Sequence, residues 1–332
     1  MTAILLYGSC HTLKETKYTK NKSEINQTTN LIAIIPKDYQ IQLGKGIDVD
    51  WVKTSKGSQT YNRKMVSDFK KIGFSHVRIR VTENTQKDNL KHLENVVNDC
   101  LNENLIPIIA YQADFFKNDP TTENLNKVVD WWGAVATHFQ NTSHKLSFDI
   151  IIEVTDALNK EPEILNQLYE KSVNEIRKTN PNRIIFISPR MRSDPEYLSD
   201  LKIPTKYNNF LMIETHFYAA GPSKTNPKKQ WTTGTANEKK LVHFKIQQVL
   251  QWQTQNKILC WIGAWMPGDY ADQNTFTIDE QKSFAQYMTC QLSKNNIPFA
   301  INADHHFYDA KKNEWDEKRK TILETILQTN CE

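Results

Sequence analysis

Short runs of β-branched and aromatic residues alternate along the chain with longer segments whose apolar residues recur every three or four positions. The short runs are typical of buried strands and the longer segments of amphipathic helices. The expected strands are 40–49, 76–81, 105–111, 147–154, 183–188, 210–218, 258–264 and 298–304. The expected helices are 62–73, 89–104, 123–140, 166–180, 240–256, 279–296 and 317–328. This alternation predicts an α/β fold, the (β/α)8 or TIM barrel.

The length of 332 residues suits one barrel, which we expect over residues 39–332. Residues 1–38 form a tail in which a short apolar run and Gly8-Ser9-Cys10 precede a polar Lys/Asn/Thr/Ser tract that cannot pack. The tail resembles the leader and tether of a bacterial lipoprotein with Cys10 as the lipidated residue, although the apolar run is short and no basic residue precedes it. We therefore expect a location in the bacterial cell envelope or outside the cell, with membrane contact only through a lipid on Cys10.

Composition narrows the classes of function. Hydrophobic residues make up 39% and charged residues 24%, which is ordinary for a globular domain. The net charge is +4 and the lysines are scattered, so no nucleic-acid partner is expected. The five cysteines show no metal-binding spacing, and Cys100, Cys260 and Cys290 lie in apolar patterns that favour free thiols. We expect no cofactor and a monomer.

In a barrel of this kind the chemistry lies at the carboxyl ends of the strands. The polar and aromatic residues at or just after these ends are therefore the predicted site residues. As proton-transfer groups we select Asp156, Glu214, His216 and Tyr218. As ligand-binding groups we select Arg78, Arg80, Gln112, Arg190, Arg192, Trp231, Trp265, Asn302, Asp304 and His305. So many charges at one rim would be costly to bury without mutual pairing or a ligand.

Several segments resemble glycoside hydrolase family 5, the cellulase family, over residues 40–328. They are KGIDVDW, GFSHVRIRV, IIIEVTDALNKEP, NPNRIIFISP, ETHFYAAGP and ILCWIGAWMPGDY, in that order. The resemblance implies that Arg78 steadies a nucleophile and that His216 and Tyr218 line the cleavage point. It makes a polysaccharide or oligosaccharide the expected partner.

The resemblance also implies a defect. The family's strand-4 motif, Glu, two residues, then Asn-Glu-Pro, laid on the segment from Glu153 puts Asp156 on the Asn and Ala157 on the acid/base Glu. The strand-7 motif Gly-Glu-Phe falls on Gly263-Ala264-Trp265, so the nucleophile position is Ala264. Retaining cleavage needs two carboxyl groups about 5 Å apart. The alignment supplies neither, and because neighbouring positions differ too, natural divergence is favoured over a laboratory double mutant.

Three hypotheses remain. The first is an enzyme with displaced machinery: the arginines suit an anionic sugar such as a uronate, and a Tyr or His base suits lyase-type β-elimination. The second is a pseudoenzyme that only binds glycan, through Trp231, Trp265 and the arginines. The third is unrelated chemistry, since barrels host many reactions. No metal site is expected, because His305 and His306 would point to opposite faces of a strand.

Overall fold

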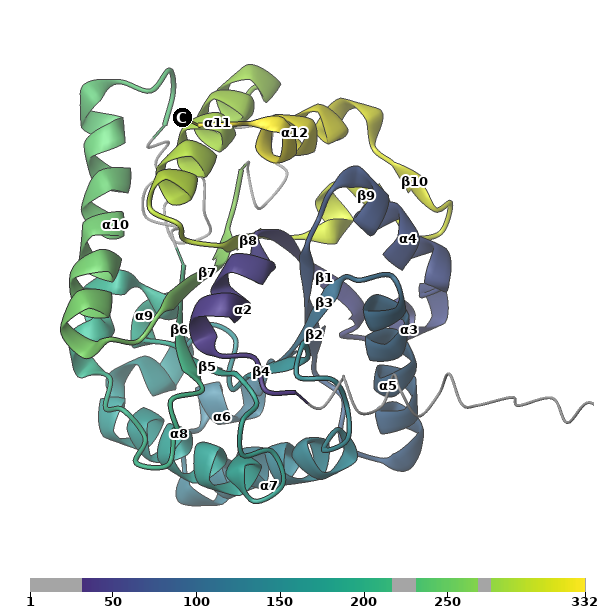
Figure 1. Ribbon diagram of the computed structural model, residues 1–332, viewed down its shortest axis with the longest axis vertical. Coiled ribbons are helices and arrows are strands. Elements are labelled where there is room, and N and C mark those ends of the chain that lie inside the picture. The colour runs from purple at the N-terminus through teal and green to yellow at the C-terminus, as the bar shows by residue number, and fades with distance from the viewer. Residues whose placement is uncertain (1–31, 217–230, 268–275, 332) are drawn as a thin grey trace, which may run out of the picture.

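Eight parallel strands close into a barrel in chain order, and helices surround it (Figure 1). The computed structural model describes residues 32–216, 231–267 and 276–331. The barrel strands are β1 (Lys45–Val52), β2 (His76–Val81), β3 (Ile106–Tyr111), β4 (Ser147–Asp149), β5 (Ile185–Ile187), β6 (Leu211–His216), β7 (Cys260–Trp265) and β8 (Phe299–Ile301). The predicted (β/α)8 barrel is confirmed.

The outer layer consists of helices between and after the strands. The longer ones are α4 (Arg63–Ile72), α5 (Lys87–Asn102), α7 (Thr122–His138), α8 (Pro162–Arg177), α10 (Ala236–Asn256), α11 (Ile278–Lys294) and α12 (Glu317–Gln328). Short elements lie at the loops: α3 (Ser55–Thr60), α6 (Asp114–Asn118), η1 (Asp156–Lys160), α9 (Arg190–Ser193), η2 (Pro195–Asp200), η4 (Asp304–His306), β9 (Tyr308–Asp309) and β10 (Glu314–Trp315). Every predicted helix is present, whereas the short elements were not predicted.

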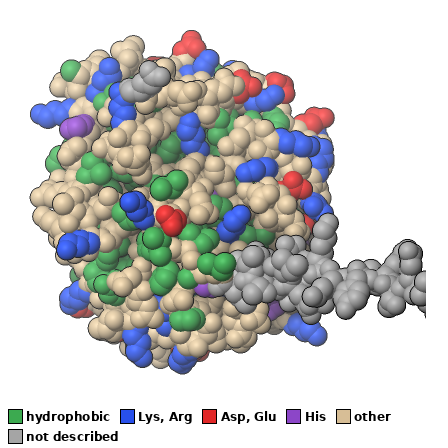
Figure 2. All heavy atoms as spheres, in the orientation of Figure 1, with side chains coloured by type: hydrophobic (Ala, Val, Ile, Leu, Met, Phe, Trp, Pro, Cys, Tyr) green, Lys and Arg blue, Asp and Glu red, His purple; other side chains and the backbone are tan. Residues whose placement is uncertain are grey.

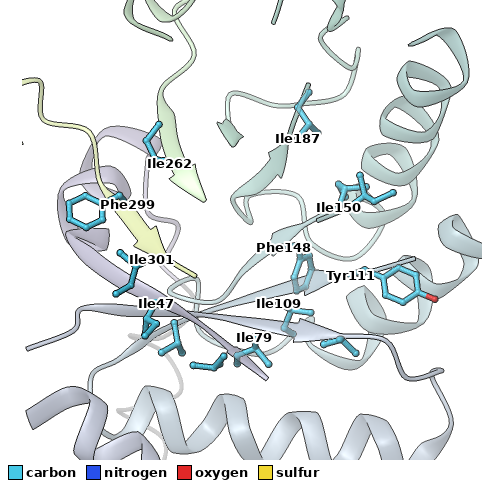
Figure 3. Packing of buried hydrophobic residues seen from close by; sticks show 14 of the residues in the cluster. Ile47, Ile79, Ile109, Tyr111, Phe148, Ile150, Ile187, Ile262, Phe299 and Ile301 are labelled. Atoms are coloured by element: carbon cyan, nitrogen blue, oxygen red, sulfur yellow. The ribbon is translucent and has the colours of Figure 1, made fainter. Parts of the chain in front are cut away.

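Alternate strand residues point outward into the main hydrophobic core, and these include Ile47, Ile79, Phe148, Ile187 and Ile262 (Figure 3). Their regular alternation with inward residues follows from the period of two in a strand. Burying side chains of this size stabilises the fold by about 1.5–3 kcal/mol each. The core between strands and helices therefore holds the strand ends, which carry the mouth residues, in fixed places.

The amino end of the barrel is closed by α2 (Pro36–Leu43), which lies across the opening in Figure 1. Tyr39 and Leu43, one turn apart, are fully buried against Phe186 and Trp261 inside the barrel. His76 of β2 links α2 to the barrel strands, since its Nδ1 donates to Leu43 O at 2.7 Å and its Nε2 accepts from Trp261 of β7 at 3.1 Å. On the face shown in Figure 2, Lys and Arg are dispersed and form no stripe.

Three predicted strand boundaries were wrong. Residues 40–43 belong to α2, so the first strand starts at Lys45, after Pro36 at the first turn has set the helix. The fourth strand ends at Asp149 rather than residue 154, and the eighth ends at Ile301 rather than 304. In both cases the apolar run continues beyond the last ladder bond, so hydrophobicity alone could not mark the end. His305 and His306 consequently lie in η4, outside any strand.

Cys290 forms a disulfide with Cys331, which corrects the expected free thiol. The bond ties α11 to the end of the chain across a sequence separation of 41 residues. Cys100 and Cys260 are buried free thiols, as the apolar pattern predicted. Closing a loop of this length contributes about 4 kcal/mol in the chain-entropy model. Sequence alone could not pair these cysteines, because their positions meet only after the barrel has closed.

Candidate functional site

The middle of the barrel holds a layer of buried charge centred on Arg78 of β2. Its guanidinium makes two bonds to Asp48 of β1, at 2.8 and 2.6 Å, and one to Asp149 of β4 at 3.3 Å. A further bond reaches Glu214 of β6. Burial opposes the charge of Arg78, but these carboxylates raise its pKa well above its usual value. Arg78 is therefore the permanent cation around which this layer is built.

Glu214 is accommodated because residue 263 on the neighbouring strand is glycine: a Cβ on Gly263 would collide with the Glu214 carboxylate. Burial raises the pKa of Asp149 far above its usual range, and the charge of Glu214 adds to this, against the opposing influence of Arg78 and His216. Burial alone would also raise the pKa of Glu214, but the charges of His216 and Arg78 lower it. Glu214 is thus the ionised acid of this pair.

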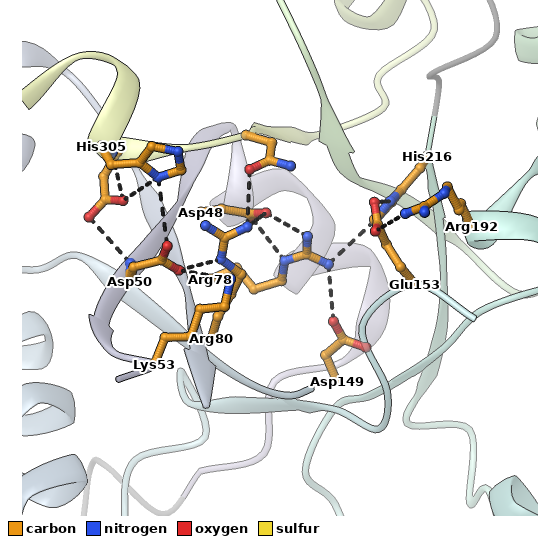
Figure 4. Close-up of polar contacts among 12 residues, drawn as sticks. Asp48, Asp50, Lys53, Arg78, Arg80, Asp149, Glu153, Arg192, His216 and His305 are labelled. Atoms are coloured by element: carbon orange, nitrogen blue, oxygen red, sulfur yellow. Dashed lines mark hydrogen bonds and ion pairs between the residues drawn. The ribbon is translucent and has the colours of Figure 1, made fainter. Parts of the chain in front are cut away.

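Above this layer, Glu153 and His216 connect the ends of β4 and β6 (Figure 4). Nδ1 of His216 lies 3.3 Å from Glu153 Oε1, and its Nε2 lies 2.7 Å from Glu214 Oε1. Arg192 of α9 donates to Glu153 Oε2 at 2.9 Å. The backbone of Glu153 has φ of 50°, a conformation that costs a non-glycine residue about 1–3 kcal/mol and is often found at functional sites.

We call Glu153, Arg192, Glu214 and His216 the β4–β6 group. Each charged form in this group is stabilised by the opposite charges beside it. Burial disfavours the charged imidazole, yet the charge of Glu214 and the hydrogen bonds to Glu153 and Glu214 raise the pKa of His216 to about 9. Burial would likewise raise the pKa of Glu153, but His216, Arg192 and Lys117 together hold it far below its usual range. At neutral pH the group consists of an imidazolium between two carboxylates.

A second group lies at the ends of β1, β2 and β8, on the other side of Arg78 in Figure 4. Arg80 donates from Nε to Asp50 at 2.7 Å and from Nη1 to Asn302 at 3.0 Å. Asp304 accepts from two backbone N–H groups, Asp50 N at 3.3 Å and His305 N at 2.8 Å. We call Asp50, Arg80, Asn302, Asp304 and His305 the β1–β8 group.

The two carboxyls of the β1–β8 group titrate differently. Burial, and then the charge of Asp50, raise the pKa of Asp304 to about 7, against the opposing influence of Arg80. Burial would raise the pKa of Asp50 too, but Arg80 and Lys53 lower it. Near neutral pH, Asp50 is charged and Asp304 is partly protonated.

Among the described residues, Asp50, Asp304 and His305 form a group whose ligand atoms could meet at a metal ion, since these atoms lie within 4.8 Å of one another. Three ligands of this kind are chemically suitable for a divalent cation. However, the Arg80 guanidinium is already ion-paired with Asp50 at 2.7 Å. A second positive charge at this place would be repelled, so the arrangement does not favour a metal.

The mouth collects most of the predicted site residues: Arg78, Arg80, Arg192, Glu214, His216, Asn302, Asp304 and His305. Tyr218 lies outside the described residues. Three others are in different surroundings. Arg190 pairs with Asp200 and lies over Tyr197, Gln112 bonds to Asp114, and the exposed Asp156 bonds to Thr155 within η1.

The prediction that Trp231 and Trp265 present ring faces to a sugar was wrong. Trp231 is 1% exposed and packs on Phe284 and Tyr287 of α11. Trp265 is fully buried between Phe284 and Phe299, on the outward side of β7. Large aromatics are far more often core than ligand platforms, and the sequence contained no signal that distinguished the two.

Several mouth residues were not selected from the sequence: Asp48, Asp50, Asp149, Glu153 and Lys117. A usable signal existed for two of them. Asp48 and Asp50 share the strand parity that faces inward, and Asp48 lies in register with Arg78. For Glu153 the motif register hid the signal, because the family's strand-4 motif was laid with Glu153 as its first acid, which put the acid/base position on Ala157.

Residues 40–305 match the family model described as cellulase, glycosyl hydrolase family 5. Endoglucanase H of Acetivibrio thermocellus is 24% identical over 263 residues, which are 75% of this chain but only 29% of that protein. The chain therefore spans less than a third of the length of this relative.

Solved structures share the fold at low identity. Thermotoga maritima Cel5A in complex with mannotriose superposes with a TM-score of 0.76 at 18% identity, covering 88% of this chain and 99% of that one. The cellulose synthase subunit Z, CcsZ, of Clostridioides difficile gives 0.72 at 20% identity, covering 86% and 99%. Within the described residues, no helix has the length and apolar character needed to cross a membrane.

Proposed function

The chain belongs to the cellulase family, glycosyl hydrolase family 5, a family of carbohydrate-active barrels, and on that premise we propose that its mouth binds a neutral β-linked glycan without cleaving it by retaining hydrolysis. One observation carries the proposal. The β4 end presents Glu153 to the mouth, whereas β7 offers the fully buried Ala264, which packs with Met266. Double displacement requires a second carboxyl group, and the β7 position supplies none.

We place the family's strand-4 motif four residues earlier than the sequence alignment did. β4 ends at Asp149, and the motif fits when its first acid is placed there. The two intervening residues are then Ile150 and Ile151, Ile152 takes the place of the Asn, and Glu153 takes the place of the acid/base Glu. Ala157, in contrast, lies in η1, beyond the strand. Glu153 also contacts His216 of β6, as a carboxylate acting at the mouth should. In this register the chain keeps the strand-4 acid and lacks the strand-7 nucleophile.

Even the retained acid is poorly suited to proton donation. A general acid works best when its pKa lies near the operating pH. The pKa of Glu153 is held far below that range by His216, Arg192 and Lys117, so its proton is absent at neutral pH. Glycan binding is therefore better supported than family-type hydrolysis.

The contacts also favour a neutral ligand over an anionic one. Arg78, Arg80, Arg190 and Arg192, whose guanidinium groups were the reason to expect a uronate, are each already ion-paired with a carboxylate of the protein. Lyase-type β-elimination has similarly weak support. His216 is cationic at neutral pH and cannot accept a proton, and Tyr218 lies outside the described residues.

A second candidate function is slow glycoside cleavage by an inverting route. The observation that favours it is the split between the ionised Glu153 and the partly protonated Asp304, since acid and base roles go to carboxyls with separated pKa values. In this route Asp304 protonates the departing oxygen, while Glu153 takes a proton from water that attacks the anomeric carbon. Proton NMR of the first-formed anomer from cellohexaose tests it. Absence of any product over days removes this candidate.

The main proposal is tested with cellohexaose and mannohexaose, by calorimetry for binding and by new reducing ends for cleavage. We expect wild-type protein to bind at least one of them and to release no reducing ends at ordinary turnover. Ala264→Glu combined with Glu214→Gln restores the missing β7 carboxyl without adding net charge beside Arg78, and Arg192→Ala raises the pKa of Glu153 towards that of a general acid, so the triple variant should gain retaining hydrolysis. The same triple variant with Ala157→Glu in place of Ala264→Glu is the matched control and should gain nothing. Turnover by the wild type, or failure to bind any neutral β-glycan, would overturn the proposal.

We further infer that the protein works in an oxidising compartment, the bacterial cell envelope or the outside of the cell. The disulfide between Cys290 and Cys331 supports this, because structural disulfides persist chiefly in such compartments. Cys10, the proposed lipid attachment site, lies outside the described residues. Mass spectrometry of the protein from its native cells tests both points. Reduced Cys290, or an unmodified Cys10 in the mature chain, would contradict the respective proposal.

A further inference from the structure

We propose that Arg80 and Asp50, backed by Asn302 and Asp304, form a subsite for two neighbouring hydroxyl groups of a neutral sugar. This subsite rests on the proposed glycan binding and names the chemistry that one side of the mouth recognises. It lies at the ends of β1, β2 and β8, away from Glu153 and His216 (Figure 4).

The first observation is a hydrogen-bond donor without an acceptor. Arg80 is 5% exposed, and its Nε and Nη1 are engaged by Asp50 and Asn302. Its Nη2 is buried and has no hydrogen-bond partner among the described residues. Leaving such a donor unsatisfied costs about 1–3 kcal/mol, so an oxygen atom from water or a ligand is expected to fill the place.

The second observation is an open acceptor beside this donor. The Asp50 side chain is 28% exposed, whereas that of Asp304 is 9% exposed. Asp50 uses Oδ1 for Arg80, and its Oδ2 lies 3.6 Å from His305 Nδ1. A sugar hydroxyl can donate to the partly exposed Asp50, and a small rotation of the buried Arg80 guanidinium brings Nη2 to the oxygen of the neighbouring hydroxyl. One ring edge thereby satisfies both groups.

The charges of the subsite disfavour an acidic sugar such as a uronate. Asp50 and Asp304 are both carboxyls, and Asp50 is already ion-paired with Arg80 at 2.7 Å and with Lys53 at 3.8 Å. A uronate carboxylate would have to approach two acidic side chains to reach one arginine nitrogen. Hydroxyl groups meet no such repulsion, because they donate to acids and accept from arginine.

The surface next to the subsite leaves room for further sugar rings. A hollow of about 410 Å³ lies between α3, η4 and the start of α12. His305 lines it together with Lys56, Tyr308 and Arg319. His305 therefore borders both the subsite and this hollow, and a glycan longer than one ring can continue from the first into the second.

The test is calorimetric titration with cellohexaose and with an oligoglucuronate of equal length. Asp50→Asn and Arg80→Lys should each weaken cellohexaose binding about tenfold, which corresponds to about 1.4 kcal/mol. Asp50→Asn should also strengthen oligoglucuronate binding, because it removes the repelling charge. Arg190→Lys is the matched control: the arginine pairs with Asp200 and bonds to the Asn159 carbonyl rather than to the β1–β8 group, and affinity should not change.

The outcomes separate this inference from the proposed function. If wild-type protein binds cellohexaose but both mouth variants bind it equally well, the subsite is refuted and glycan binding stands. If no neutral glycan binds, both fail. If Arg80→Lys does not fold, Asp50→Asn decides alone. Titration with Ca²⁺, Mn²⁺ and Zn²⁺ should show no binding, and micromolar affinity lost in Asp304→Asn would replace the sugar subsite by a metal site.

Discussion

Glu153 and Asp304 are both buried carboxyls at the mouth of one barrel, yet they titrate in opposite directions. The pKa of Glu153 is far below its usual range, and that of Asp304 is raised to about 7. Burial raises the pKa of both, so burial does not explain the difference. The neighbours do: Glu153 is surrounded by His216, Arg192 and Lys117, whereas Asp304 lies beside the carboxylate of Asp50.

The comparison shows that the number of charged residues at a rim is a poor guide to its chemistry. In the β4–β6 group the cationic side chains are paired with carboxylates of the same group, so none is left to bind an anionic ligand. The β1–β8 group has one arginine for two acids and leaves one nitrogen of that arginine unsatisfied. Of the two groups, the second is therefore the better place for a polar, uncharged ligand.

The largest expected effect comes from removing the cation that lies between the two groups. Arg78→Ala should lower the free energy of unfolding by about 3–5 kcal/mol, because Asp48 and Glu214 would keep buried, uncompensated charge. Urea unfolding followed by tryptophan fluorescence measures it. Arg63→Ala, at an arginine side chain that is 60% exposed, should change stability by less than about 0.5 kcal/mol. Equal effects of both changes would show that the central charges do not stabilise the fold.

His216 tests the β4–β6 group by pH. Its folded pKa of about 9 exceeds the unfolded value near 6.5, so its contribution is complete below pH 6.5 and is lost as the pH rises through 9. Wild-type protein should lose about 3 kcal/mol from this residue between pH 6.5 and 10. His216→Gln should show a correspondingly flatter dependence in urea titrations. An unchanged slope would mean that the imidazole is neutral and the proposed network is wrong.

Asp304 tests the β1–β8 group, where Asp50, Arg80 and His305 face the carboxyl. The folded pKa of about 7 exceeds the unfolded value near 3.9, so stability falls as the pH rises from 4 through 7. Asp304→Asn should remove about 2 kcal/mol of this fall between pH 5.5 and 8. The slope is the readout, because the new amide also disturbs the two backbone hydrogen bonds. If the variant keeps the wild-type slope, Asp304 is ionised throughout.

The smallest expected effect comes from a change that leaves Glu153 with fewer cationic neighbours, as is the case for Asp304. Arg192→Ala removes a cation from Glu153 and should cost about 1 kcal/mol at pH 7, since the arginine is partly exposed. It should also raise the pKa of Glu153, so that acid unfolding begins at higher pH than in the wild type. Lys202→Ala, which breaks an exposed pair with Glu163, is the control and should leave the acid transition in place.

Much of the fold was readable from the sequence. Alternating apolar periods predicted the barrel, all the longer helices and the strand ends near which Arg78, Arg80, Glu214 and His216 lie, because periodicity is a local property of the chain. The identity of the residue at each rim position, including Ala264 on β7, is likewise present in the sequence. These features need no knowledge of what lies across the barrel.

The tertiary structure decided the partners. Arg78 and Glu214 are 136 residues apart, and the sequence does not say that they meet, nor that Cys290 and Cys331 do. It also decided where strands end: β4 stops at Asp149 and β8 at Ile301, so Glu153 and Asp304 lie beyond the strands that were predicted to contain them. Trp231 and Trp265 became core rather than ligand surface because helix α11 covers them. The physical reason is common to all of these: pairing, burial and pKa depend on distances between groups that only the closed barrel brings together.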